Sequence, residues 1–296
     1  MPKVQNVEVS AEESGQKLLQ FLQRRLQGGV PRSALMRWIR TGQVRVDSSR
    51  AKPFQRVREG QRVRIPPYTP QERDPVAGGE ERNPFLLRTV HEDEELLVLA
   101  KPSGLASQLG SGLTDSVDSR LQRAYPDAPW RPCLVHRLDK DTSGLLLAAK
   151  SYDQLRYLQR LWRGGEVAKI YVAWVAGATE WFAWTELRDT LRREAKQDRP
   201  AREVTALSRV RTLASRAGAS LVGIRLETGR KHQIRIQMSR RELPVLGDSK
   251  YGGPQSGQGL MLHACHLAWP GRCFTLPPPW TGEYAVSSAE LAPLLE

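Results

Sequence analysis

The stretch Val135-His-Arg-Leu-Asp-Lys-Asp-Thr-Ser-Gly144, followed at once by Leu145-Leu-Leu-Ala-Ala149, decides how this chain is interpreted. Its first part brings two aspartates, an arginine, a histidine and two hydroxyl groups into one polar loop. Its second part is an unbroken apolar run, which is typical of a buried strand. Proteins often display chemistry on such loops, although Asp-Thr-Ser-Gly is also ordinary turn chemistry. The stretch alone therefore allows either a surface turn or an active-site loop.

Length, charge and cysteine content restrict the class of protein. The 296 residues are enough for one large domain or two smaller ones. Lys and Arg number 45 against 32 Asp and Glu, and the net charge of +13 favours a polyanionic partner or an acidic membrane surface. The three cysteines, at 133, 265 and 273, have no spacing typical of a disulfide framework or a four-ligand zinc site.

The chain also lacks the sequence marks of an exported or membrane-bound protein. No apolar signal-peptide core occurs at the N-terminus, and nowhere do about 18 uncharged apolar residues run together. We therefore expect a cytoplasmic protein without a membrane span. His263, Cys265 and His266 lie close together, but no complementary pair follows at a metal-ligand spacing, so we predict no metal site.

The basic charge is concentrated near the N-terminus. Between positions 17 and 65, 13 Lys or Arg residues stand against two acids, a surplus of 11 out of the net +13. Leucines at helical spacing predict a helix over 18–26 that Gly28-Gly29 ends. A second helix is predicted from Pro31 to about Gly42, and short strands over 44–46 and 57–65. The outer face of the second helix is expected to carry Arg32, Arg37 and Arg40.

The rest of the chain predicts a linker and a second domain. Positions 67–84 have almost no apolar content and many turn formers, which is typical of an interdomain linker. From 85 onward, short apolar strands follow one another with few helices between them. We therefore predict an N-terminal domain over 1–66 and an α+β domain over 85–296, with a mostly antiparallel mixed sheet flanked by helices.

The polar loop resembles the catalytic signature of the RluA family of RNA pseudouridine synthases. The resemblance covers His136-Arg-Leu-Asp-Lys-Asp-Thr-Ser-Gly144. It implies that Asp139 is the essential carboxylate and that Arg137 helps to push the target base out of its helix, since a stacked base is inaccessible. We also expect His136 to bind the substrate.

Three further motifs are similar to elements of the same family. In Lys169-Ile-Tyr171, on a predicted strand, the resemblance places Tyr171 against the uracil ring, and Lys169 shares its face. In Thr228-Gly-Arg-Lys-His-Gln-Ile234, it implies that Arg230 pairs with the catalytic aspartate and that Ile234 forms an apolar wall beside the base. His232, Gln233 and Arg235 are expected to support the turn or to touch RNA. The third, Gly247-Asp-Ser-Lys-Tyr-Gly252 with Leu262-His-Ala264, is expected to be architectural.

The N-terminal segment resembles the S4-like RNA-binding domain, in Val30-Pro-Arg-Ser33 and in Arg40-Thr-Gly-Gln-Val-Arg-Val46. A charge-rich helix face is often merely solvated, but the one-sided excess favours phosphate binding, which would be strongly salt-dependent. The residues that we expect to bind RNA there are Arg32, Arg37, Arg40 and Arg45. The partner is accordingly RNA, bound by a monomer.

The resemblance implies a reaction that needs no cofactor. The enzyme breaks the N1–C1′ bond of uridine, rotates the uracil and rejoins it through C5. Asp139 would act either as a nucleophile at C1′ or as a base at C2′, and the sequence does not choose between them. Asp141 is expected to brace the turn, rather than to form a glycosidase pair with Asp139.

The substrate remains open to several alternatives. The domain layout most resembles the RluC branch of the family, whose members modify uridines of large-subunit ribosomal RNA. The RluD branch shares that layout, and transfer RNA is a further possible substrate. A non-catalytic ribosome-assembly factor and a nucleoside hydrolase are the rivals from other classes. The presence of Asp139, Tyr171 and Arg230 disfavours the first rival, and the basic N-terminal segment disfavours the second.

Overall fold

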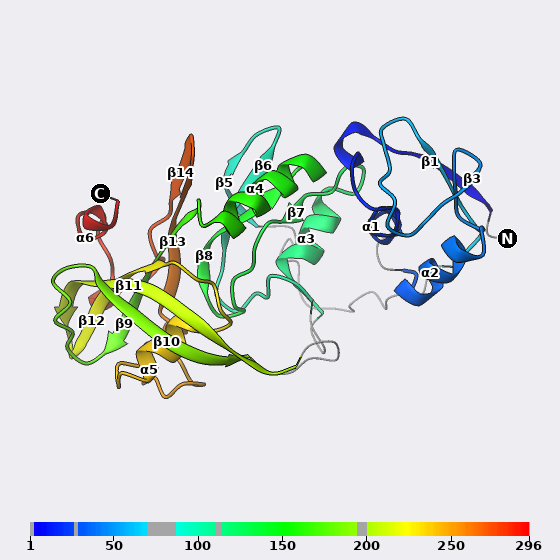
Figure 1. Cartoon of the computed structure of the whole chain (residues 1–296). Coiled ribbons are helices and arrows are strands. Elements are labelled where there is room, and N and C mark those ends of the chain that lie inside the picture. Colours follow the sequence, from blue (N-terminus) through cyan, green and yellow to red (C-terminus); the bar gives the residue numbers. More distant parts are fainter. Residues whose placement is uncertain (1–2, 27–28, 70–86, 110–113, 194–199, 296) are drawn as a thin grey trace.

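The chain forms two units in the computed structural model, which describes residues 3–26, 29–69, 87–109, 114–193 and 200–295. A small N-terminal unit precedes a larger unit built on a single ten-stranded sheet (Figure 1). The predicted linker over 67–84 lies outside the described residues from position 70 onward. The domain bounds 1–66 and 85–296 therefore stay predictions.

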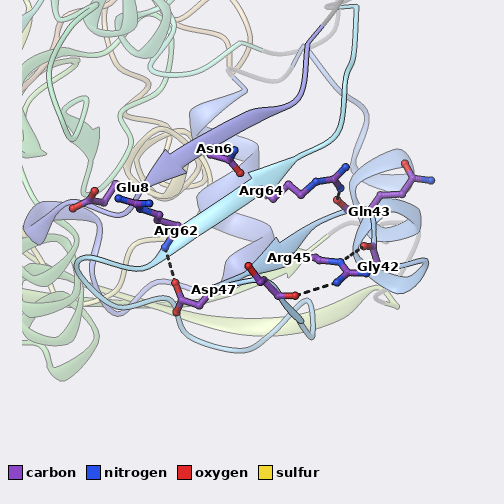
Figure 2. A pocket seen from close by; sticks show the side chains of 9 residues that line it. Asn6, Glu8, Gly42, Gln43, Arg45, Asp47, Arg62 and Arg64 are labelled. Atoms are coloured by element: carbon purple, nitrogen blue, oxygen red, sulfur yellow. Dashed lines mark hydrogen bonds between the residues drawn. The ribbon is translucent and has the colours of Figure 1, made fainter.

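The N-terminal unit consists of two helices packed on one face of a four-stranded antiparallel sheet. The sheet has the order β1-β4-β2-β3, and its other face is open, as Figure 2 shows. Its elements are β1 (Gln5–Glu8), a 3-10 helix (Ala11–Glu13), α1 (Leu18–Arg25), α2 (Arg32–Arg40), β2 (Arg45–Val46), β3 (Ser49–Arg50) and β4 (Arg62–Ile65). The predicted strand over 57–65 is shortened to β4, because Gly60 takes a positive φ of 77° in a turn closed by the Gln61 amide on the Arg58 carbonyl.

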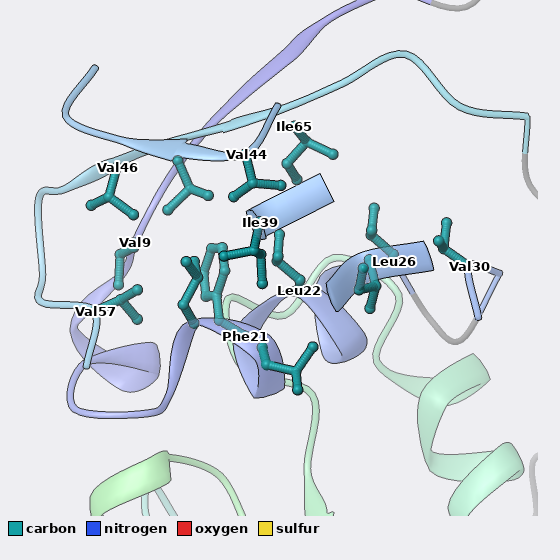
Figure 3. Close-up of a cluster of buried hydrophobic side chains, with 14 residues drawn as sticks. Val9, Phe21, Leu22, Leu26, Val30, Ile39, Val44, Val46, Val57 and Ile65 are labelled. Carbon is teal, nitrogen blue, oxygen red and sulfur yellow. The ribbon is translucent and has the colours of Figure 1, made fainter. Parts of the chain in front are cut away.

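Alternation along the strands sorts this unit into a core face and a solvent face. Val63 and Ile65 of β4 are fully buried and join Leu35 and Ile39 of α2 in one apolar cluster (Figure 3). Side chains alternate across a strand, so the arginines of β4 point the other way. Gly42, directly after α2, has a φ of 74°, the conformation expected of a glycine that ends a helix.

The larger unit confirms the predicted α+β domain with a mixed, mostly antiparallel sheet. The strand order is β10-β11-β12-β9-β13-β8-β6-β5, and only β8 and β13 are paired in parallel. Two short strands, β7 and β14, pair with β8 and β13. The strands are β5 (Arg88–Glu92), β6 (Leu96–Lys101), β7 (Cys133–Leu134), β8 (Ser143–Ala149), β9 (Ala168–Ala176), β10 (Thr185–Arg193), β11 (Arg202–Arg216), β12 (Ala219–Leu226), β13 (Leu262–Trp269) and β14 (Arg272–Thr275).

Helices cover both faces of this sheet, which explains why β8 is buried throughout. Leu145 and Leu147 face the cluster under α4 (Tyr152–Gly164), whereas Leu146 faces the one under α3 (Val117–Ala124). On the other half of the sheet, α5 (Gln233–Ser239) covers one face. The C-terminal segment, with α6 (Ser288–Leu291) and two 3-10 helices (Gly282–Tyr284 and Ala292–Leu294), covers the opposite face.

Gly144 joins the polar loop to the sheet at a point of close backbone approach. Its φ is 122°, and Ala264 of β13 lies directly opposite it in the parallel pairing. A β-carbon at this position would overlap the backbone of Ala264. Glycine is therefore required here by both conformation and space.

An arginine on α1 makes one of the contacts between the two units. The Arg24 guanidinium lies 3.6 Å from the ring centroid of Trp130, and it donates a 2.6 Å hydrogen bond to the carbonyl of Arg131. Such cation–π contacts contribute about 0.5–2 kcal/mol. In the described residues, no helix is both long enough and apolar enough to cross a membrane.

Candidate active site

The polar loop lies between β7 and β8 and carries Asp139 on a tightly held backbone. The Thr142 amide donates to the Asp139 carbonyl at 3.2 Å, which closes a turn. Leu138, directly before Asp139, is buried, and the hydroxyl of Ser107 bonds both its carbonyl (2.7 Å) and its amide (3.0 Å). The Asp139 side chain remains 30% exposed. A rigid backbone thus presents a carboxylate that a substrate can reach.

A buried lysine fixes the same loop from below. Lys101, at the end of β6, is 2% exposed, and its Nζ donates to the carbonyls of Pro102, Leu105 and Lys140. Burial lowers the pKa of Lys101 to about 8, although the charges of Asp141 and Asp139 oppose the shift. This loop-holding role of Lys101 was not predicted from the sequence.

The expected brace at Asp141 is made by its backbone. Its carbonyl accepts a 2.7 Å hydrogen bond from the Ser103 hydroxyl, while its side chain is exposed.

His232 is the basic side chain nearest to Asp139. Its Nε2 lies 3.8 Å from Oδ1 of Asp139, and its Nδ1 forms a 2.9 Å hydrogen bond with the hydroxyl of Tyr251. The backbone of His232 is left-handed, with a φ of 53°, directly before α5. Burial lowers the pKa of His232, and the charge of Asp139 opposes this shift.

A buried ion pair supports Tyr251, the residue whose hydroxyl is bonded to His232. Arg235 of α5 binds Asp248 through two 2.7 Å hydrogen bonds, and both side chains are almost fully buried. Asp248 also accepts the Tyr251 amide at 3.1 Å. The motif over 247–252, which we expected to be architectural, thus holds Tyr251 against His232.

Tyr171 of β9 lies on the side of the sheet that holds Asp139. It packs between the cluster that contains Leu138 and the cluster that contains Ile234. Burial, and then the negative charge of Asp139, raise the pKa of the Tyr171 phenol well above its usual value. The hydroxyl is therefore protonated at neutral pH, and an apolar wall that includes Ile234 surrounds the ring.

Arg230 is placed differently from what the family resemblance implied. Among the described residues, no ion pair joins it to Asp139 within 4.0 Å. Its Nε donates instead to the Thr205 carbonyl at 3.0 Å, and its amide donates to Oε1 of Gln233. The implied pairing is therefore not formed in this structure, where His232 is the side chain that lies beside the carboxylate.

The other predicted residues of the larger unit divide into exposed and buried ones. Arg137 is exposed and free to meet a substrate. His136 instead stacks on Trp162 with ring centroids 4.2 Å apart, and its Nε2 accepts from the Leu147 amide. Burial lowers the pKa of His136 to about 3. Lys169 is 6% exposed, with its Nζ 5.8 Å from the Trp162 ring. The Nε2 atom of His136 is therefore already occupied by a hydrogen bond within the fold.

The predicted arginines of the N-terminal unit do not share one surface. Arg32, Arg37 and Arg40 are exposed on α2, whereas Arg45 lies on the open face of the sheet. In the part of the chain that the structure describes, no group of three His, Cys, Asp or Glu side chains is arranged to hold a metal ion.

Comparison with known sequences identifies relatives over most of the chain. Residues 95–240 match the family model described as RNA pseudouridylate synthase. Ribosomal large subunit pseudouridine synthase C of Escherichia coli K12 is 36% identical over 290 residues, covering 90% of this chain and 88% of that protein. The protein of the same name from Vibrio vulnificus is 35% identical over 286 residues, with the same coverage.

Solved structures agree with the sheet architecture. Human RNA pseudouridylate synthase domain containing 4 superposes with a TM-score of 0.55 at 25% identity, covering 64% of this chain and 88% of that chain. Human RNA pseudouridylate synthase domain containing 1 has a TM-score of 0.52 at 21% identity, covering 68% and 86%, and supports the fold alone.

Proposed function

Because this chain belongs to the RluA family of RNA pseudouridine synthases, we propose that it isomerises specific uridines of large-subunit ribosomal RNA to pseudouridine. The observation that carries the proposal is the partly exposed carboxylate of Asp139, held by a rigid loop on the side of the sheet where the half-buried Tyr171 lies. The relatives named for the large ribosomal subunit match the chain over 90% of its length, which supports the substrate. Ribosomal RNA as substrate favours a cytoplasmic location.

The proposed chemistry starts at Asp139. Its carboxylate either attacks C1′ or removes a proton at C2′, and in both routes the N1–C1′ bond breaks. The freed uracil turns within the pocket. C5 then forms the new bond to C1′, as the Asp139–C1′ bond breaks in the first route or as the proton on Asp139 returns to C2′ in the second. The C5 proton then leaves and N1 gains a proton, so the product is an isomer of the substrate.

Each neighbouring side chain has a proposed task in these steps. The apolar wall with Ile234 and the ring of Tyr171 hold the detached uracil and keep water away from it. Because its phenol is protonated at neutral pH, Tyr171 takes the C5 proton only as its own hydroxyl proton passes toward N1, so that the phenol stays neutral. Arg137, which is exposed at the loop, fills the space that the flipped base leaves. His232 fixes the orientation of the carboxylate.

The N-terminal unit is proposed to bind RNA as an S4-like domain. Its two helices on a small sheet, and the exposed arginines Arg32, Arg37 and Arg40 of α2, support this role. Their contacts would be to phosphates, which position the RNA but do not read its sequence.

The test compares the wild-type protein with two single carboxylate variants of the same loop. Pseudouridine is mapped by carbodiimide-stopped primer extension on large-subunit ribosomal RNA. We expect stops with the wild type and with Asp141→Asn, and none with Asp139→Asn. Stops with all three proteins would show that Asp139 is not the catalyst.

Two other outcomes would redirect the substrate proposal. If the wild type produced stops only on transfer RNA or on other ribosomal RNA, the chemistry would stand with a different substrate. If no RNA were modified while RNA binding was intact, the protein would be a non-catalytic RNA-binding factor.

A further inference from the structure

Three arginines stand in register across the sheet of the N-terminal unit. Arg50 of β3 is directly opposite Arg45 of β2, and Arg45 is directly opposite Arg64 of β4. Asn6 of β1 follows opposite Arg64 and completes the line across all four strands. We call these four residues the arginine row. Residues directly opposite in a sheet share a face, so their side chains lie side by side.

The arginine row lies on the face of the sheet that no helix covers. Val63 and Ile65 alternate with Arg62 and Arg64 along β4, and the two apolar side chains point into the core. The opposite face carries a hollow of about 920 Å³, lined by Asn6, Arg45 and Arg64 among others (Figure 2). Arg50 adjoins it, because its Nε lies 3.2 Å from the β-carbon position of Gly42, which lines the hollow.

The positive charge of the row is not neutralised within the described residues. No acidic side chain there lies within 4.0 Å of the guanidinium groups of Arg45, Arg50 or Arg64. Their recorded partners are backbone carbonyls: Gly42 and Ser48 accept from Arg45, and Gln43 accepts from Arg64. Like charges directly opposite in a sheet destabilise it, so an anionic ligand would reduce the repulsion between these arginines.

The neighbouring cross-strand pair on the same face joins an arginine to an acidic residue, not to another arginine. Arg62 of β4 stands opposite the acidic Glu8 of β1. Asp47 is also beside it, with its carboxylate accepting from the Arg62 amide and from the Gln61 side chain, each at 2.8 Å. In the described residues Arg62 also has no acidic side chain within 4.0 Å of its guanidinium group, but unlike the row it has Glu8 opposite it and Asp47 beside it.

We propose that the arginine row binds the phosphate backbone of RNA, as a second RNA surface on the side of the sheet away from α2. Adjacent strands are about 4.8 Å apart, so three successive arginines span roughly 10 Å. That line can hold neighbouring phosphates of one strand, and guanidinium groups bind phosphate oxygens in pairs. The amide of Asn6 adds an uncharged donor at the end of the line.

This surface rests on the proposed function, because it assumes that the partner of the protein is RNA. It extends that function, since α2 and the arginine row lie on opposite sides of the same small core. RNA that contacts both sides would have to pass around an edge of the sheet. An acidic protein would meet the same charges, but the excess of 11 positive charges in this segment fits a polyanion better than a single acidic patch.

The experiment uses two substitutions that make the same chemical change on one strand. Arg64→Gln removes a member of the row, and Arg62→Gln removes the arginine that faces Glu8. Affinity of the full-length protein for in vitro transcribed large-subunit ribosomal RNA is measured over a series of salt concentrations. The slope of log affinity against log salt reports the number of phosphate contacts.

We expect Arg64→Gln to reduce that slope by about 0.7 and the triple variant of Arg45, Arg50 and Arg64 by about 2, as for single-stranded contacts. Arg62→Gln should keep the wild-type slope. Equal slopes for Arg64→Gln, Arg62→Gln and the wild type would overturn the proposal.

Two controls separate this proposal from other failures. Thermal unfolding without RNA should show the row variants at least as stable as the wild type, because like-charge repulsion has been removed. A lower unfolding temperature for them would mean that the row is structural. Pseudouridine mapping on the wild type tests the proposed function separately, so an active wild type with unchanged slopes in the variants would refute the row alone.

Discussion

The Nε2 atom of His232 lies 3.8 Å from Oδ1 of Asp139. In the described residues, no other nitrogen of a Lys, Arg or His side chain lies within 4.0 Å of this carboxylate. The ring is itself fixed by the Tyr251 hydroxyl, which the buried Arg235–Asp248 pair helps to position. His232 therefore belongs to a continuous chain of contacts that ends at the proposed catalyst. It acts through Asp139, as a positioning residue.

Loss of this ring should slow the reaction step more than it weakens RNA binding. We expect His232→Gln to lower kcat roughly 10- to 100-fold, because misplacing a catalytic group by about 1 Å has effects of this size. Tyr251→Phe, which removes only the supporting hydroxyl, should produce a smaller loss in the same direction. Single-turnover kinetics on ribosomal RNA would measure both.

The matched control is Lys231→Gln, at the exposed neighbouring position. A rise in KM without a fall in kcat for His232→Gln would instead mean that His232 contacts RNA directly.

Replacing Lys101 should loosen the catalytic loop. Lys101→Met keeps the length of the side chain but leaves three carbonyls without their buried donor. Each buried group that loses its partner costs about 1–3 kcal/mol, so the free energy of unfolding should fall measurably. Urea unfolding would test this, with Lys140→Met as the control, since that lysine is exposed in the same loop. Equal stability of the two variants would contradict the role given to Lys101.

Acid should destabilise the fold through two histidines, the half-buried His136 and the buried His263. Burial lowers the pKa of His136 to about 3 and that of His263 to about 4, both below the ordinary value of 6.5. Between these values the unfolded chain binds protons that the folded chain does not. Their contribution is therefore complete above about pH 6.5 and is lost as the pH falls, at about 1.4 kcal/mol per pH unit for each histidine.

The variant His263→Gln separates this effect from general acid sensitivity. His263 bonds the Ser143 hydroxyl at 2.8 Å and the Leu276 carbonyl at 3.0 Å, so the substitution should lower stability at neutral pH. It should also flatten the dependence of stability on pH between about 7 and 5, because one titrating group has gone. Parallel curves for variant and wild type would show that His263 does not contribute.

Arg24→Ala should loosen the contact between the two units. It removes both the cation–π contact with Trp130 and the hydrogen bond to the Arg131 carbonyl. We expect a broader distribution of distances between spin labels placed on α1 and α4, measured by double electron–electron resonance. Arg25→Ala removes the same charge from a side chain whose ion pair, with Glu13, lies inside the N-terminal unit. The two distributions should differ, and identical ones would show that Arg24 does not restrain the units.

Local patterns were sufficient for much of the fold. The apolar run 145–149 became β8, and the leucine and glycine spacing predicted α1, α2 and the cap at Gly42. Alternation also sorted β9 correctly, with Tyr171 on one face and Ile170, Val172 and Trp174 on the other. These features depend on residues that are close together in the chain.

The site depended on longer-range geometry that the sequence does not contain. Arg230 and His232 are two residues apart, and their spacing in the sequence does not show that His232 lies beside Asp139 while Arg230 bonds the Thr205 carbonyl. Lys101 could not be identified as a loop anchor, because its three acceptors come together only through the pairing of β6 with β8. The arginine row likewise exists only through strand register.

Gly144 shows that a residue can be indispensable to a reaction in which it has no part. It has no side chain to offer a substrate, yet any other residue there would push β8 away from Ala264 and shift the turn that carries Asp139. A saturation mutagenesis screen scored by pseudouridine formation would therefore rank Gly144 beside the catalyst. Only a second screen, scored by protein abundance, would distinguish the residue that provides clearance from the residue that performs the chemistry.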